Sequence, residues 1–117
     1  LNCKIAEYTA AVLRGRPSFH ISLAMDISPF CDCHAENDAP IIPDMGMFAS
    51  FDPVALDKAC VDMANRQPVL PNSYLAEQPQ THGDRFMDMH PSTNWKTQVS
   101  HAEKLGLGSS DYELIEI

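Results

Sequence analysis

The chain has 117 residues, a formal net charge of −8 and 44% hydrophobic residues. That length suits one domain with a modest core, and the composition excludes an intrinsically disordered chain. An acidic surface repels nucleic-acid phosphates and anionic lipids, and no apolar run is long enough to cross a bilayer, so we expect no nucleic acid and no membrane as partners.

Two elements are predicted before residue 28. Residues 2–14 have the apolar spacing of a helix, with Ile5, Tyr8 and Val12 on one face. Residues 18–27 alternate between apolar and polar side chains, which is the period of a strand. We expect the apolar set of this strand to face the core. Its members are Phe19, Ile21, Leu23, Met25 and Ile27.

A polar loop, a strand and a helix follow. The loop covers residues 31–40, and residues 41–49 read as a second strand whose start is irregular at Pro43. Asp52 is a good helix N-cap and Pro53 a good first helical residue, so a helix is predicted from there to about residue 66.

The last part of the chain is less regular. Residues 67–93 are rich in proline and lack periodicity, residues 94–105 predict a third helix, and residues 112–117 a short final strand. The order α-β-β-α-α-β predicts an α/β fold, a small mixed sheet with packed helices, in a single domain at 1–117. The chain begins at Leu1, so we expect the C-terminal part of a longer domain. Its uncovered sheet would favour a homo-oligomer or pairing with the missing N-terminal half.

The four cysteines do not have the spacing of a secreted disulfide framework. Cys31 and Cys33 are separated by one residue, and Cys60 lies in an apolar helical pattern. We therefore expect a cytoplasmic protein, in which a pair of neighbouring cysteines favours metal or redox chemistry.

The loop sequence Cys-Asp-Cys-His at residues 31–34 is the principal candidate site. Thiolates and imidazoles bind zinc, and thiolates also hold iron–sulfur clusters. The candidate metal ligands are Cys31, Cys33, His34 and Asp26. Two cysteines do not close a tetrahedral site, so further ligands would come from His82, His90 or another chain. The alternative is two free cysteines in a polar loop.

Two other hypotheses remain open. Asp26, Asp44 and Asp57 could form an acidic pocket for acid–base or metal-assisted chemistry on an unknown small molecule. Asp57 is predicted at the edge of the buried helix face, where a carboxylate is either paired or functional. Otherwise the chain is a structural or assembly fragment with no site of its own. No Walker loop, GxSxG or HExxH motif indicates a reaction, so the sequence leaves open whether the chain is an enzyme.

Three segments together resemble the family called domain of unknown function 362: ISPFCDCH (27–34), NDAPIIPDMG (37–46) and SFDPVALD (50–57). The tail HAEKLGLG (101–108) is similar to that family's ending. The resemblance implies the C-terminal portion of a larger α/β domain, an iron–sulfur association with a ferredoxin-like partner or segment, and an unassigned activity. This chain lacks the CxxCxxCxxxCP run of such a segment, so a cluster would use Cys31 and Cys33 with outside ligands.

Overall fold

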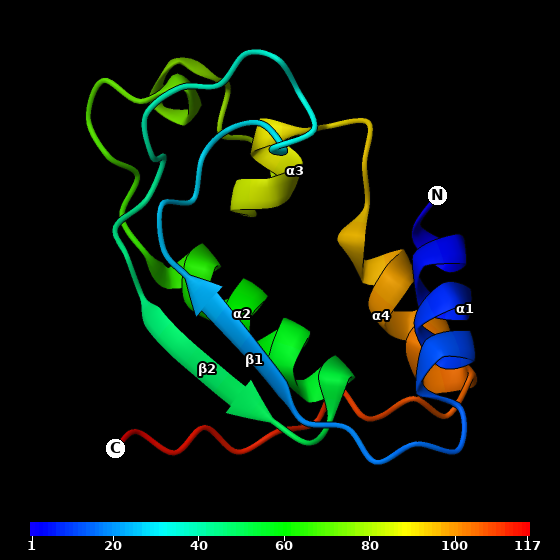
Figure 1. Cartoon of the computed structure of the whole chain (residues 1–117). Coiled ribbons are helices and arrows are strands. Elements are labelled where there is room, and N and C mark those ends of the chain that lie inside the picture. Colours follow the sequence, from blue (N-terminus) through cyan, green and yellow to red (C-terminus); the bar gives the residue numbers. More distant parts are fainter. The chain divides into compact units, whose positions relative to one another are not determined.

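The computed structural model describes all of residues 1–117 as a mixture of helices and two strands (Figure 1). The elements are α1 (Asn2–Leu13), β1 (His20–Ala24), β2 (Gly46–Ser50), α2 (Pro53–Arg66), the 3₁₀ helix η1 (Tyr74–Glu77), α3 (Arg85–Met89) and α4 (Trp95–Lys104). β1 and β2 pair as an antiparallel two-stranded sheet. The predicted α/β class and the order helix, strand, strand, helix, helix are confirmed. No helix has the length and apolar composition needed to span a bilayer.

The chain divides into two compact units, each with its own core. The first unit contains residues 1–22, 48–61 and 94–117, and the second contains residues 23–47 and 62–93. The core of the first unit consists of Ala6, Val54 and Ala102, with Val99 and Leu107 packed against it. The core of the second unit consists of Ile41, Ile42, Ala64, Leu75 and Met89. The boundary between the units falls within β1, β2 and α2.

The start of α2 forms as its sequence predicts. Asp52 accepts the N–H groups of Val54 and Ala55 through Oδ1, at 2.8 and 3.0 Å, so it caps the helix. Its other oxygen, Oδ2, accepts the N–H of Ser109 at 2.9 Å. One carboxylate therefore holds the start of α2 and the segment that follows α4.

The faces predicted for the first helix and first strand are wrong. Tyr8 and Val12 on α1 are 72% and 64% exposed, and the buried residue of that helix is Ala6. On β1, Ile21 is 59% exposed whereas Ala24 is buried. Phe19, Leu23 and Met25 of that strand pattern are exposed as well, whereas Ile27 packs against the core of the second unit as predicted. The alternation was read correctly, but period alone does not say which face another element covers.

The elements around the strands and after α2 differ from the prediction in extent. β2 begins only at Gly46, because Pro43 lacks an N–H and Gly46 has a φ of +100° that interrupts a regular ladder. Residues 67–93 contain two short helices, η1 and α3. Residues 112–117 form no strand, and their backbone pairs with neither edge of the sheet. A strand needs such a partner for its N–H and C=O groups.

Candidate functional site

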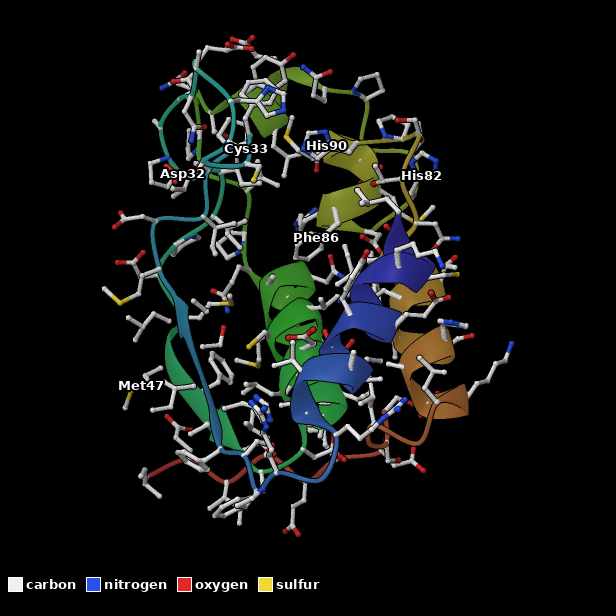
Figure 2. The ribbon with its side chains drawn as sticks, turned by 45° about the vertical axis from the view of Figure 1, so that its right-hand side comes forward. Asp32, Cys33, Met47, His82, Phe86 and His90 are labelled. Atoms are coloured by element: carbon white, nitrogen blue, oxygen red, sulfur yellow. The ribbon has the colours of Figure 1, made fainter.

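The Cys-Asp-Cys-His loop lies in the second unit and is anchored through the residue before it. The Phe30 ring packs against the Tyr74 ring on η1, with centroids 5.2 Å apart, and against the His90 ring at 6.2 Å. His90 Nε2 also lies 2.8 Å from the carbonyl oxygen of Pro29. Figure 2 shows the labelled loop residues and His90 at the same end of this unit. This contact commits His90 Nε2 to positioning the loop, so that nitrogen is not a spare metal ligand.

Asn37 closes the base of the loop. Its Oδ1 accepts the N–H of Phe30 at 3.3 Å, and its Nδ2 donates to the Phe30 carbonyl oxygen and to Ser28 Oγ. Within the loop, the His34 N–H donates to the carbonyl oxygen of Cys31 at 2.9 Å. The loop is therefore a turn with fixed ends, and its residues from Cys31 to Ala39 are exposed.

Cys31 and Cys33 interact with each other and are not in a disulfide. Both are exposed free cysteines. The Cys31 sulfur accepts hydrogen bonds from the Cys33 backbone N–H and from the Cys33 thiol. Both lower the pKa of Cys31, the backbone N–H more than the thiol. The pKa of Cys33 is raised, chiefly because its thiol is the donor in that contact. The pair therefore holds a thiolate most readily at Cys31, with Cys33 as its hydrogen-bond donor.

The other two predicted ligands have different partners. His34 Nδ1 lies 3.7 Å from the Glu36 carboxylate. Asp26 has a φ of +50°, and its N–H donates to Asp44 Oδ1 at 2.8 Å, so these aspartates stabilise the turn after β1. No group of three or more His, Cys, Asp and Glu side chains is placed to hold a metal ion. The structure brings Cys31 and Cys33 together but does not gather the four predicted ligands into one group.

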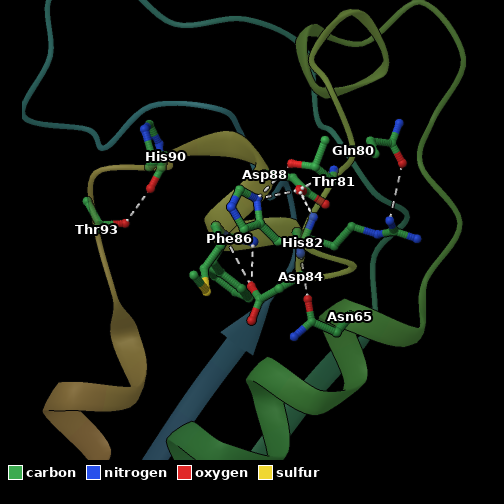
Figure 3. Close-up of polar contacts among 11 residues, drawn as sticks. Asn65, Gln80, Thr81, His82, Asp84, Phe86, Asp88, His90 and Thr93 are labelled. Atoms are coloured by element: carbon green, nitrogen blue, oxygen red, sulfur yellow. Dashed lines mark hydrogen bonds and ion pairs between the residues drawn. The ribbon is translucent and has the colours of Figure 1, made fainter.

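The contact of the exposed His82 with the buried Asp88 is the feature that sequence reasoning missed. Asp88 on α3 is 2% exposed, and its Oδ1 accepts the N–H groups of Thr81 and His82 at 2.9 and 2.8 Å. The same oxygen lies 2.9 Å from His82 Nδ1 (Figure 3). Asp88 Oδ2 is buried without a partner. Burial raises the pKa of Asp88, but the hydrogen bonds from His82 and Thr81 outweigh it and hold the pKa below its ordinary value.

The pair fixes the orientation of one imidazole. An Asp88 carboxylate that accepts from Nδ1 leaves Nε2 of His82 as the free acceptor nitrogen, on a side chain that is 38% exposed. In the sequence, the only sign that His82 could contact Asp88 is Gly83 between them. Gly83 has a φ of +64°, and the turn there brings the His82 segment back to α3. The burial of Asp88 depends on packing that a short irregular segment does not reveal.

The third aspartate of the predicted acidic pocket belongs to the first unit. Asp57 is exposed, but partial loss of hydration raises the pKa of its carboxyl group. The charge of His20 opposes this rise. Gln98 Nε2 donates to Asp57 Oδ2 at 3.4 Å. Nearby, burial raises the pKa of Cys60, whose thiol bonds with Ser22. The pKa of Asp57 is thus raised by its own surroundings, and the acidic pocket stays a prediction.

The comparisons with known proteins concern the first half of the chain. A family model described as Domain of unknown function (DUF362) matches residues 1–62, which include the loop at 31–34 and the start of α2. The tail at 101–108 lies outside the matched residues, so its resemblance, the expected C-terminal position and the iron–sulfur association stay predictions. No curated protein and no solved structure matches the chain.

Proposed function

The chain belongs to the Domain of unknown function (DUF362) family, and on that premise we propose that it is a metal-binding module whose Cys31 and Cys33 thiolates bind zinc or one edge of an iron–sulfur cluster. The observation that carries this proposal is the pair of exposed thiols in mutual contact on a loop with fixed ends. Vicinal thiolates are ligands that soft and borderline metals select.

The electrostatics of the pair suit metal capture. A thiol must lose its proton to bind a metal, and Cys31 does so more readily than an ordinary cysteine because Cys33 donates to its sulfur. A bound cation would then favour the thiolate of Cys33 as well. His34 directly follows Cys33, and its imidazole is the third metal ligand that the same loop offers.

The chain supplies too few ligands for a closed site. Zinc in structural sites takes four ligands, and iron–sulfur clusters usually take four cysteines. No such group is present in this chain. The proposal is therefore a shared site, in which a second copy or a ferredoxin-like partner completes the coordination. The exposure of both cysteines permits such an approach.

Thiol reactivity tests the state of the pair. Under anaerobic conditions at pH 7.5, we expect iodoacetamide to alkylate Cys31 at least about fivefold faster than Cys60, because the pKa of Cys31 is lowered and that of Cys60 is raised. Peptide mass spectrometry over time measures both rates. In Cys31→Ser, Cys33 should react faster than it does in the wild type, because the contact that raises its pKa is lost. Equal rates at Cys31 and Cys60 would contradict this description of the pair.

Metal affinity tests the proposed function itself. We expect anaerobically purified protein to retain zinc or iron and to compete with a chromophoric chelator for Zn²⁺. Cys31→Ser and Cys33→Ser should each weaken Zn²⁺ binding by at least about tenfold. Cys3→Ser and Cys60→Ser are matched controls, because they remove the other free cysteines and should leave the affinity unchanged. Metal at background in the wild type, or an affinity that Cys31→Ser does not alter, would refute the proposal.

A further inference from the structure

An open hollow of about 420 Å³ lies within the first unit, whereas the cysteine loop belongs to the second unit. Its walls come from the end of α1, the segment that leads to β1, the residues around the start of α2 and the turn after α4. The lining residues that matter here are Leu13, Arg14, Ser18, Phe51, Leu105 and Leu107. The size lies within the range of pockets that hold small molecules, about 300 to 1,000 Å³.

The surface of the hollow is divided almost equally between polar and apolar atoms, and part of its apolar lining is exposed. Phe51 is 78% exposed and Leu105 is 42% exposed, although both side chains are large and hydrophobic. Leu107 packs against the core of the unit and forms the floor on that side. Covering Phe51 and Leu105 with a ligand's hydrocarbon would remove apolar surface from water, which is favourable.

Arg14 is the one charged side chain in the lining. It is exposed and has no hydrogen bond or ion pair, in a chain whose acidic residues outnumber its basic ones by 16 to 8. A guanidinium presents a planar fork of N–H donors that matches a carboxylate with two parallel hydrogen bonds. An unpaired arginine beside the exposed apolar side chains Phe51 and Leu105 is therefore complementary to a ligand with one anionic end.

Ser18 supplies a second polar contact. Its Oγ lies 3.0 Å from His20 Nε2. When that nitrogen carries a hydrogen and donates it to Oγ, the hydroxyl hydrogen of Ser18 is free to donate into the hollow. Both polar groups of the lining then offer donors, which again selects an acceptor such as a carboxylate.

We infer that this hollow binds a small amphipathic carboxylate, with its hydrocarbon against Phe51, Leu105 and Leu107 and its carboxylate on Arg14. A purely polar anion would leave the apolar walls uncovered, and a neutral hydrocarbon would leave the guanidinium unpaired. The apolar side chains and the guanidinium together therefore favour a ligand that has both a hydrocarbon part and a carboxylate. This site is separate from the thiol pair and does not depend on metal binding.

Octanoate is the probe for the test, with acetate and 1-octanol as partial ligands. In a ¹H–¹⁵N NMR titration of the whole chain, we expect octanoate to bind saturably and to shift amides around the lining residues. Acetate shares only the carboxylate of octanoate, and 1-octanol shares only its hydrocarbon. Each should therefore bind at least about tenfold more weakly than octanoate. Arg14→Gln should weaken octanoate binding by about tenfold, the size expected for loss of a charge-assisted pair.

Matched variants separate the site from general surface effects. Arg16→Gln removes a neighbouring exposed arginine that does not line the hollow, and it should leave the affinity within about twofold. Phe51→Ala should weaken octanoate binding, whereas Ile21→Ala, which changes another exposed apolar residue outside the lining, should not. Unsaturable binding, or equal effects of Arg14→Gln and Arg16→Gln, would overturn the inference.

Discussion

Gly108→Ala is expected to lower the free energy of unfolding by about 3 kcal/mol. A Cβ at this position would collide with the Asp52 carboxylate. That carboxylate cannot simply move aside, because Oδ1 caps α2 through Val54 and Ala55, and Oδ2 accepts the N–H of Ser109. Displacing it costs the helix cap, typically about 1 kcal/mol, and a charge-assisted bond worth about 1.5–3 kcal/mol. Urea unfolding followed by circular dichroism measures the loss.

A double-mutant cycle with Asp52→Ala isolates the cause. Asp52→Ala alone should also destabilise the chain, by loss of the same hydrogen bonds. In that background Gly108→Ala has no carboxylate to meet, so its additional cost should fall to about 0.5 kcal/mol or less. If Gly108→Ala cost the same with and without Asp52, the collision would not be the origin of the effect.

Asp88→Ala is expected to destabilise the second unit by about 3 kcal/mol. The change removes the acceptor of the Thr81 and His82 N–H groups and the partner of the His82 ring. The lost bonds are partly buried and run to a charged acceptor, and a hydrogen bond to a charged group contributes about 1.5–3 kcal/mol. Asp88→Asn keeps an oxygen acceptor and should cost less than Asp88→Ala. Chemical denaturation of the three proteins at pH 7 gives the ranking.

The pH dependence of stability provides the second measurement on Asp88. Its pKa is lowered in the folded state, so the unfolded chain binds the proton more readily. Its contribution is therefore fully present above the ordinary aspartate value of about 3.9 and is lost as the pH falls through the lowered folded value. Asp88→Asn should abolish this component of the acid-induced loss. Asp32→Asn, a change on the exposed loop, should leave it in place, and an unchanged acid profile in Asp88→Asn would contradict the assignment.

Only part of the proposed metal site could be predicted from local sequence. Cys31 and Cys33 are two residues apart, so their approach to one ion can be predicted from the sequence, and the turn in the loop brings the two thiols into contact. His34 and Asp26 were assigned as ligands by proximity in sequence. Asp26 instead donates its N–H to Asp44, a pairing that the turn after β1 decides. The distances between such groups depend on backbone conformation, which composition does not specify.

Features that depend only on neighbouring residues can be predicted from the sequence. Asp52 and Pro53 start α2 because capping and a preset φ are local properties, and the alternation from residue 18 to 27 predicts a strand because side chains alternate along any extended backbone. Tertiary structure decided which side of that strand is covered. It left Ile21 exposed, because burial depends on which element packs against a face.

Tertiary structure also decided the two features with the most specific chemistry. Asp88 is an ordinary polar residue in the sequence, and only packing around α3 buries it against His82. Arg14 is one of two nearby arginines. Only the packing of α1 with the start of α2 and the turn after α4 places Arg14 in the lining of the hollow, while Arg16 lies outside it. Contacts between distant segments arise from the packing of whole elements, so no local pattern in the chain encodes them.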